Sequence, residues 1–510
     1  MTCSTLDSAG VARKDVRVQG VMNPRLSLRG ALSDSYDLTS RSRRATKQSD
    51  ASASDCHAPI EKHRGFQPRA CRGARNDTRV KGATKVTSRP HTRISVTALL
   101  CPLLVLLSDV NAQEQYVVLN IAPGEEHQSA YEQIHQLAKK TSSDHVGLGI
   151  GAIFSYLNQS RDQCKDDLIE FLSLAERYEI PIVVQLDGEQ WWEARPDLWN
   201  WWDPARPGYD SGNRQNVEWS GWGPEHAMKI AWRNWGRQLR VLPPPNFMSL
   251  RYRRACHDEM RILIPLILQW WKQLPENKRY LLIGIKLGWE SAIGVNSFYY
   301  PNGNALLDLS DDKDPQTELK GDQIPDRGVT AIGYAAVMTA HLADRGALQE
   351  DHLAEIVRRH LDDLCALAAE LGVPREKLFT HVGGWKDEEL LYDAALNKYS
   401  CPGWSFYRHA SDPAKDKGVQ KALQKSDAPF WAAVEWLLTG SNNAEAWHNA
   451  IKRTLSNPKC RYLCIYNWSG IKNDRAAIGA IQRILSVRNV RPEKRDAGPE
   501  AEVDSVKRAP

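Results

Sequence analysis

Short apolar segments alternate with longer amphipathic segments between Gln113 and residue 490. The short segments are rich in β-branched residues and almost continuously apolar, which predicts strands that are buried on both faces. The longer segments repeat apolar residues at intervals of three and four, which predicts helices. The predicted strands are 116–122, 145–153, 181–187, 280–288, 378–384, 403–409, 430–435 and 461–468. The predicted helices include 129–140, 164–178, 259–274, 351–372, 444–455 and 476–487.

The alternation of strands with helices predicts βαβ units and a parallel sheet. Eight such units between residues 113 and 490 predict an α/β fold, a (β/α)8 TIM barrel with long βα loops, as the catalytic domain. A doubly wound open sheet is the alternative. The turn 122–125 after the first strand lacks the glycine-rich fingerprint of a dinucleotide-binding sheet, which favours the barrel. The polar tail 491–510 is expected to be disordered.

The chain before the predicted barrel has a different character. Residues 1–93 show no sustained apolar period and are predicted to be disordered, or to be a mis-assigned extension. Arg93, the 14-residue apolar run Ile94–Leu107 and a V-x-A site that ends at Ala112 are typical of a signal peptide, here 94–112. We therefore expect a secreted or periplasmic protein. An uncleaved membrane anchor is the alternative, although the run is shorter than the roughly 20 residues of a membrane span.

Charge is divided unevenly along the chain. Residues 1–112 contain 19 Lys and Arg against 9 Asp and Glu, whereas residues 113–510 contain 48 against 53. Because the predicted barrel is net negative, it does not attract phosphate by bulk charge, and no nucleic-acid partner is expected.

All 18 tryptophans lie between Trp191 and Trp468, and many of them follow the third predicted strand. Flat aromatic faces stack on the apolar faces of sugar rings, so this composition indicates a carbohydrate partner. Trp270 and Trp271 are expected to be core residues, because they lie on an apolar helix. At least two of the loop tryptophans are expected to contact a ligand, and the candidates are Trp199, Trp201, Trp202, Trp219 and Trp222.

Six cysteines follow residue 113, at wide and irregular spacing. A zinc site needs a second ligand pair at suitable spacing, which is missing, so core thiols or a single disulfide are expected instead. No metal and no cofactor is implied.

Two carboxylates, Glu290 and Glu435, each close a strongly apolar predicted strand. An unpaired carboxylate at the edge of a buried sheet is costly unless it has a function or a salt-bridge partner. These strands are the fourth and the seventh, so the two side chains can converge at the carboxyl end of a barrel. Paired carboxylates that face one cavity are what glycosidic-bond cleavage requires. Asp187 and Glu189 are the alternative source of the acid, and a metal site built from His381, Asp187 and Glu290 is a weaker alternative.

The chain resembles clan A of the retaining glycoside hydrolases in its fourth-strand Glu, its seventh-strand Glu and the Trp that closes its eighth strand. The resemblance implies that Glu290 is the general acid/base and Glu435 the nucleophile. It also implies that Trp468 forms a sugar platform and that the Tyr407 hydroxyl bonds to the nucleophile. His381 would be the polar group of the fifth strand near the acid/base.

The chain departs from that clan at the residue before the acid/base. Clan members have Asn there, in contact with the sugar 2-hydroxyl, whereas this chain has Trp289. Either Asn296 supplies that contact, or the family is divergent and its subsite is altered. The expected function is an exported retaining glycoside hydrolase, and the alternative is a barrel that binds carbohydrate without catalysis. The remaining candidates for substrate contact are Trp289, Asp187, Glu189, Trp385, Trp436, Asn467 and Trp222.

Overall fold

The computed structural model describes residues 115–139, 145–229, 231–234, 238–293, 297–298, 332–383, 390–440 and 443–486. The predicted N-terminal extension, signal-like segment and C-terminal tail lie outside the described residues. Among the described residues, no helix combines the length and the apolar character that crossing a membrane requires.

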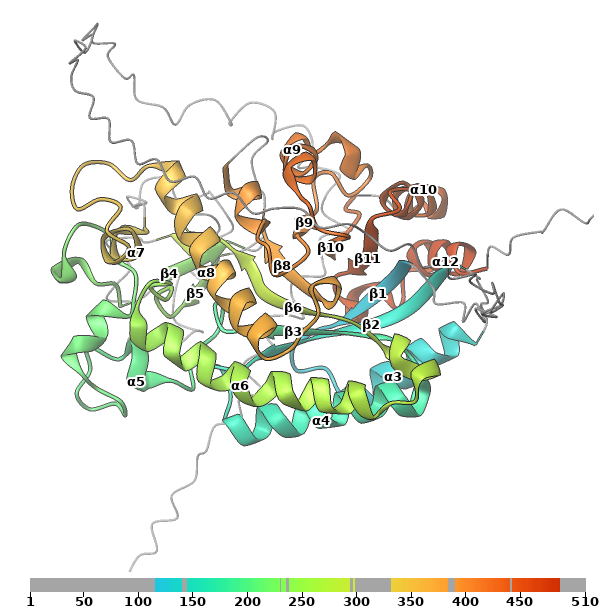
Figure 1. The fold of residues 1–510 in the computed structure, drawn as a ribbon, viewed down its shortest axis with the longest axis horizontal. Helices are drawn as coiled ribbons and strands as arrows, with labels where there is room; N and C mark the ends of the chain where they lie inside the picture. Colours follow the sequence, from blue (N-terminus) through green and yellow to red (C-terminus); the bar gives the residue numbers. More distant parts are fainter. Residues whose placement is uncertain are drawn as a thin grey trace, which may run out of the picture. The chain divides into compact units, whose positions relative to one another are not determined.

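Eight parallel strands close into a barrel, in the order β1-β11-β10-β9-β8-β6-β3-β2 (Figure 1). Closure is visible in β1, which pairs with β2 at Gln115↔Val146 and with β11 at Tyr116↔Tyr462. All eight predicted strands are present and the predicted TIM barrel is confirmed. Their bounds are β1 Gln115–Ile121, β2 Val146–Ser155, β3 Ile182–Asp187, β6 Leu282–Ser291, β8 Leu378–Val382, β9 Gly403–Phe406, β10 Trp431–Trp436 and β11 Cys460–Ile465.

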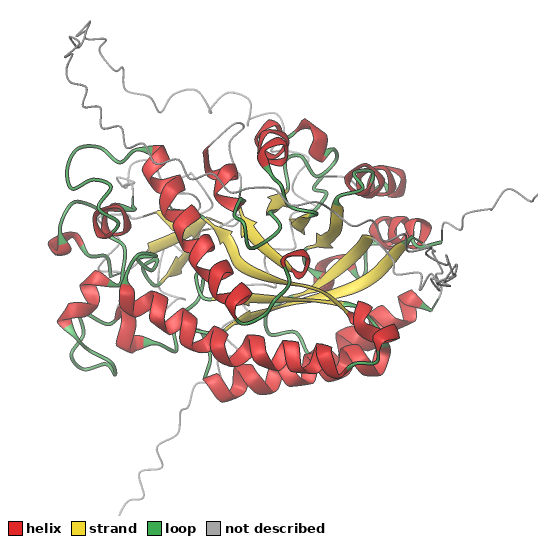
Figure 2. Cartoon of the chain, in the orientation of Figure 1, coloured by secondary structure: helices red, strands yellow, loops and turns green. Residues whose placement is uncertain are grey.

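Helices lie around the strands (Figure 2), and the six predicted ones are all present. Within the described residues, the connection from β8 to β9 has only the short 3-10 helix Leu390–Ala395. The predicted helices are α3 His127–Ala138, α4 Arg161–Tyr178, α6 Leu250–Gln273, α8 Glu350–Glu370, α10 Ala444–Leu455 and α12 Arg475–Ile484. The pattern did not predict α5 Pro196–Trp199, α7 Tyr334–Thr339, α9 Lys417–Lys425 or α11 Trp468–Ile471.

The inside of the barrel changes from apolar to polar along its axis. Alternate residues of a strand face the same side, and each layer inside such a barrel takes its side chains from every second strand. An apolar cluster that includes Val118, Val183 and Phe379 fills the amino-terminal part. Two residues further along the same strands stand the buried polar side chains Asn120, Gln185 and His381. The polar layer therefore lies next to the carboxyl ends of the strands.

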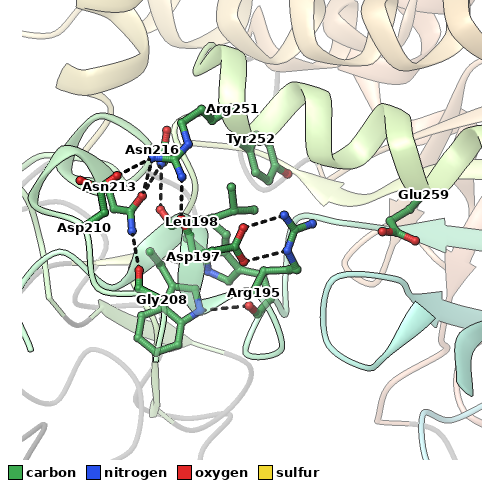
Figure 3. A network of polar contacts seen from close by, with 12 residues as sticks. Arg195, Asp197, Leu198, Gly208, Asp210, Asn213, Asn216, Arg251, Tyr252 and Glu259 are labelled. Carbon is green, nitrogen blue, oxygen red and sulfur yellow. Dashed lines mark hydrogen bonds and ion pairs between the residues drawn. The ribbon is translucent and has the colours of Figure 1, made fainter. Parts of the chain in front are cut away.

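The long segment after β3 is held together by side chains that bind its own backbone (Figure 3). Asn213 Nδ2 donates to the carbonyls of Asn200 and Gly208 at 3.1 and 3.2 Å, and Asn216 Nδ2 donates to the carbonyl of Leu198 at 3.0 Å. Arg251 at the start of α6 bonds to Asn213 Oδ1 and pairs with Asp210. These contacts fasten the segment to the amino-terminal turn of α6.

A small antiparallel sheet lies apart from the barrel and was not predicted. It consists of β4 Ala231–Asn234, β5 Gln238–Val241 and β7 Ser297–Phe298, in the order β5-β4-β7. Its strands have two to four residues, which is too short for the apolar alternation of a strand to show in the sequence.

Replacing Asn216 by Ala should lower the free energy of unfolding by about 1–3 kcal/mol. The buried amide bonds to Leu198 and to Asn213, and its oxygen accepts a 2.6 Å bond from the Ser249 hydroxyl, so its removal leaves buried groups without partners. Chemical unfolding followed by circular dichroism measures the change. Asn449→Ala is the control, since its side chain makes an exposed bond to Glu445 within α10. An equal change in the two variants would contradict this account.

Candidate active site

The fourth strand of the barrel, β6, is distorted at its carboxyl end. Gly288 and Glu290 have φ angles of 81° and 50°, in the left-handed region. The pairing with β8 passes from Leu287↔Thr380 to Ser291↔Val382, so β6 has three residues where β8 has one. A non-glycine residue at positive φ costs about 1–3 kcal/mol, and such residues cluster at functional sites. This bulge allows neighbouring side chains of β6, Trp289 and Glu290, to make contacts inside the barrel.

The seventh strand, β10, is also irregular where its carboxylate stands. It pairs with β9 at Ala433↔Trp404 and next at Glu435↔Ser405, so Val434 is one extra residue. β-Bulges re-aim side chains and are common next to active sites. Glu435 therefore stands level with Ser405, a residue that contacts Glu290.

The two bulges bring Glu290 and Glu435 together. One carboxylate oxygen of each lies within 4.8 Å of the other. The side chains come from the fourth and seventh strands, as the sequence predicts, and the two residues are 7% and 4% exposed. The carboxyl end of the barrel thus contains two nearly buried carboxylates at short range.

Glu435 accepts two hydrogen bonds. The Trp289 indole N–H donates to Oε2 at 3.1 Å, and the Tyr407 hydroxyl donates to Oε1. Burial raises the pKa of Glu435, while these two donors and the charge of Lys286 oppose the rise. Burial also raises the pKa of Tyr407 well above its usual value, so its hydroxyl keeps the proton that it donates. The contact between Tyr407 and Glu435 that the family resemblance implies is present.

Glu290 is bonded to a second set of buried groups. Ser405 Oγ donates to Glu290 Oε1 at 3.0 Å and lies 2.8 Å from His381 Nε2. His381 Nδ1 in turn lies 2.8 Å from Lys286 Nζ. Burial, with Lys286 adding to the effect, lowers the pKa of His381 well below its usual value, and burial lowers the pKa of Lys286. His381 therefore lies near the acid/base candidate, as the resemblance implies, but reaches it through Ser405.

The side chains of Glu290, His381 and Glu435 are close enough to hold a metal ion, with one candidate ligand atom of each within 4.8 Å of the others. Both ring nitrogens of His381 already contact protein groups, namely Lys286 and Ser405. An ammonium group on Lys286, 2.8 Å from the ring, would also repel a cation bound to it. These contacts favour a hydrogen-bonded carboxylate pair over a metal site.

Asp187 and Glu189 are engaged in contacts within the protein. Asp187 accepts bonds from the backbone N–H of Glu189 at 2.9 Å and from the Ser155 hydroxyl at 2.9 Å. Burial, with the Glu189 charge adding to it, raises the pKa of Asp187 to about 6. Glu189 Oε1 accepts from the Ser291 hydroxyl at 2.8 Å and lies 3.0 Å from His360 Nε2, which ties β3 to β6 and α8. These bonds suit a supporting role rather than the alternative role as the acid.

Three of the other predicted contact residues use their indole N–H groups in bonds to other parts of the protein. The indole of Trp468 is buried and donates to Gln133 of α3 at 3.2 Å, which places it against the outer helices. Trp436 is buried and donates to the Ala410 carbonyl, and Trp222 donates to the Gly346 carbonyl. Asn467 accepts a bond from Asn120 in the polar layer. Trp385 and Asn296 lie outside the described residues.

Several loop tryptophans act as packing residues. Trp199 and Trp219 are buried, and their indoles donate to the carbonyls of Trp192 and Arg214. Trp201 and Trp202 are only partly buried, and Trp202 stacks on Trp199 with ring centroids 5.5 Å apart. The six cysteines after residue 113 are buried and free of disulfides.

A cavity of about 460 Å³ lies at the carboxyl ends of β1 and β2. Trp191, Ser155 and Asn158 contribute to its lining, together with Glu125 and His127. Because all barrel strands are parallel, this cavity is on the same end of the barrel as the carboxylate pair.

Sequence reasoning missed Lys286 and Ser405, which connect the carboxylates to His381. Lys286 stands in the predicted strand 280–288, where a lysine with apolar neighbours is unexpected. This charged residue in an otherwise apolar strand is the signal that could have identified it. Ser405 gives no such signal, because a serine in a strand is common.

No protein-family model and no curated protein matches the chain. It resembles the catalytic domain of β-amylase from Paenibacillus polymyxa, with 8% identity, TM-score 0.40, and coverage of 73% of this chain and 99% of that one. A broad-specificity GH5-4 endoglucanase from an uncultured bacterium is 7% identical, with TM-score 0.37 and coverage of 74% and 95%. A ruminal GH26 endo-β-1,4-mannanase is 12% identical, with TM-score 0.36 and coverage of 74% and 64%. The matched structures are glycoside hydrolases. Since these similarities are low, the function is inferred from the geometry of the site.

Replacing Gly288 by Ala should destabilise the protein more than replacing Gly346 by Ala. The two glycines have φ angles of 81° and 83°, so both substitutions have a backbone cost of about 1–2 kcal/mol. A Cβ at Gly288 would lie 2.4 Å from Ser291 Oγ, whereas a Cβ at Gly346 would meet nothing within 4 Å. Crowding should add about 1–3 kcal/mol at Gly288 alone. Denaturant unfolding of both variants measures the difference, and equal losses would contradict the packing described for the bulge.

Proposed function

We propose that the protein is an exported glycoside hydrolase that cleaves an oligo- or polysaccharide with retention of configuration. Glu290 is the general acid/base and Glu435 the nucleophile. The observation that carries this proposal is the approach of their oxygens to within 4.8 Å. Carboxyl groups about 5–5.5 Å apart are typical of retaining enzymes, whereas inverting enzymes keep them roughly 6.5–9.5 Å apart to admit water.

The surroundings of the two carboxylates suit different roles. Glu435 accepts bonds from an indole N–H and a phenol O–H, both of which stabilise its ionised form, as a nucleophile requires. Glu290 contacts a serine hydroxyl that can either donate to a carboxylate or accept from a carboxylic acid. That hydrogen bond persists in both protonation states, which a residue that first gives and then takes a proton needs.

In the first step, Glu290 gives its proton to the leaving glycosidic oxygen while a Glu435 oxygen attacks the anomeric carbon. In the second step, the Glu290 carboxylate takes a proton from water, and that water displaces Glu435 from the sugar. The partly buried loop tryptophans, among them Trp191, Trp201 and Trp202, offer aromatic surface for sugar rings. The alternative is a barrel that binds sugar but releases no product.

Glu435→Gln should abolish turnover of an aryl glycoside library, because an amide cannot form the glycosyl intermediate. Glu290→Gln should lower turnover by about 10²–10⁴-fold, the usual contribution of a general acid. Glu355→Gln is the control, since Glu355 pairs with Arg358 and Arg359 on α8. NMR of the first-formed product anomer tests retention. Sugar binding by the wild type without release of product would instead support a non-catalytic barrel.

The loss of activity on the acid side should lie at a higher pH than an ordinary glutamate would give, because Glu435 acts ionised and burial raises its pKa. Trp289→Phe keeps an aromatic ring but removes the N–H that donates to Glu435. The pKa of Glu435 should then rise further, and the acidic limb of kcat/KM should move to higher pH by about one unit. Trp404→Phe is the matched control, since that buried indole donates to the Tyr392 carbonyl. If the acidic limb of kcat/KM stays in place in Trp289→Phe, the indole N–H does not lower the pKa of Glu435.

A further inference from the structure

A continuous chain of buried hydrogen bonds joins Lys286 to Glu290. Lys286 Nζ lies 2.8 Å from His381 Nδ1, and His381 Nε2 lies 2.8 Å from Ser405 Oγ. Ser405 Oγ lies 3.0 Å from Glu290 Oε1. This series of hydrogen bonds starts on β6 at Lys286, passes through β8 and β9, and returns to β6 at Glu290, four residues further along. None of the four residues is more than 7% exposed.

This chain can be oriented in two ways without moving a heavy atom. When Lys286 is an ammonium group it can only donate, so His381 accepts at Nδ1 and donates from Nε2, and Ser405 donates to the Glu290 carboxylate. When Glu290 is a carboxylic acid it can donate to Ser405. The serine then donates to Nε2, and His381 donates from Nδ1 to a neutral lysine amine. All three hydrogen bonds are made in both orientations.

We propose that Lys286 and Glu290 share one proton through His381 and Ser405, so that Lys286 is the proton store of the acid/base. This rests on the proposed function, in which Glu290 is the acid/base. In the transfer, a proton passes from Nζ to Nδ1, the Nε2 proton passes to Oγ, and the serine proton passes to Oε1. Lysine becomes neutral and Glu290 becomes protonated, while His381 and Ser405 are neutral before and after. Lys286 is a positioning residue, because it acts on the reaction through the chain.

The surroundings of Lys286 balance its two charge states. Burial opposes the ammonium form and lowers the pKa of Lys286. Four groups oppose that shift: Glu435 on β10, Cys464 on β11, and Asp187 and Glu189 at the end of β3. The separated charges of Lys286 and Glu290 are costly in a buried site, and transfer of the proton removes both charges at once.

A shared proton and a fixed lysine charge predict opposite pH effects. If the pair shares a proton, the alkaline limb of kcat/KM reports loss of the last proton from the pair, at or above the pKa of either group alone. Lys286→Met then leaves Glu290 alone, and the alkaline limb moves down, by about 0.3 pH unit for an evenly shared proton and by more when the lysine holds the proton more often. If Lys286 were permanently charged, its removal would raise the pKa of Glu290 and move that limb up.

The test is therefore the pH profile of kcat/KM for the wild type, Lys286→Met and Lys377→Met, with folding checked by circular dichroism. Lys377→Met is the matched control. Lys377 has a pKa lowered to about 8 by burial and donates to the Leu282 carbonyl at the amino-terminal end of the barrel. A downward shift in Lys286→Met alone is the expected result. An upward shift or no shift overturns the proposal.

A second measurement needs no substrate. ¹⁵N NMR of the labelled imidazoles distinguishes the two neutral forms of His381. Exchange into the Nδ1–H form is expected in the pH range where the pair holds one proton, and Ser405→Ala, which interrupts the chain, should abolish it. A ring that keeps only the Nε2–H form at every pH overturns the proposal. Tautomer exchange in a protein that hydrolyses no glycoside would support the relay while refuting the proposed function.

Discussion

Burial of charge at the carboxyl end of the barrel is the constraint on which the site depends. Lys286, Glu290 and Glu435 are each less than a tenth exposed, and isolated charges there would be unstable. Each is bonded to a partner from another strand or from the loop after it. Groups held this way act as one unit, because removing one partner leaves another buried charge or dipole uncompensated. Lys286 links the two carboxylates, because it interacts electrostatically with Glu435 and is joined to Glu290 by hydrogen bonds through His381 and Ser405.

Closure of the barrel explains how those partners meet. Regular pairing would send neighbouring residues of a strand to opposite faces of the sheet. The bulges at the carboxyl ends of β6 and β10 break that rule. As a result Trp289 and Glu290, adjacent in sequence, contact Glu435 and Ser405 respectively. Gly288 permits this geometry, since its neighbours leave no room for a Cβ.

The sequence was sufficient to predict the eight barrel strands and the positions of Glu290 and Glu435, because burial on both faces gives a strand a continuous apolar signal. It was insufficient for Trp468. The residues around it fit both the end of a strand and the start of a helix, and in the structure Trp468 begins α11. Lys286 and Ser405 were missed because their role depends on three strands meeting in space. The indole contact to Glu435 was missed because a bulge overrides the alternation from which side-chain direction is inferred.

Trp289 shows how the departure from the clan pattern alters the site. An indole offers one N–H and no acceptor, whereas the amide of Asn offers two donors and an oxygen. The single N–H of Trp289 is directed at Glu435 Oε2. The only polar group of this side chain is thus engaged by the carboxylate, so under the proposed function the contact to a sugar 2-hydroxyl would fall to another group.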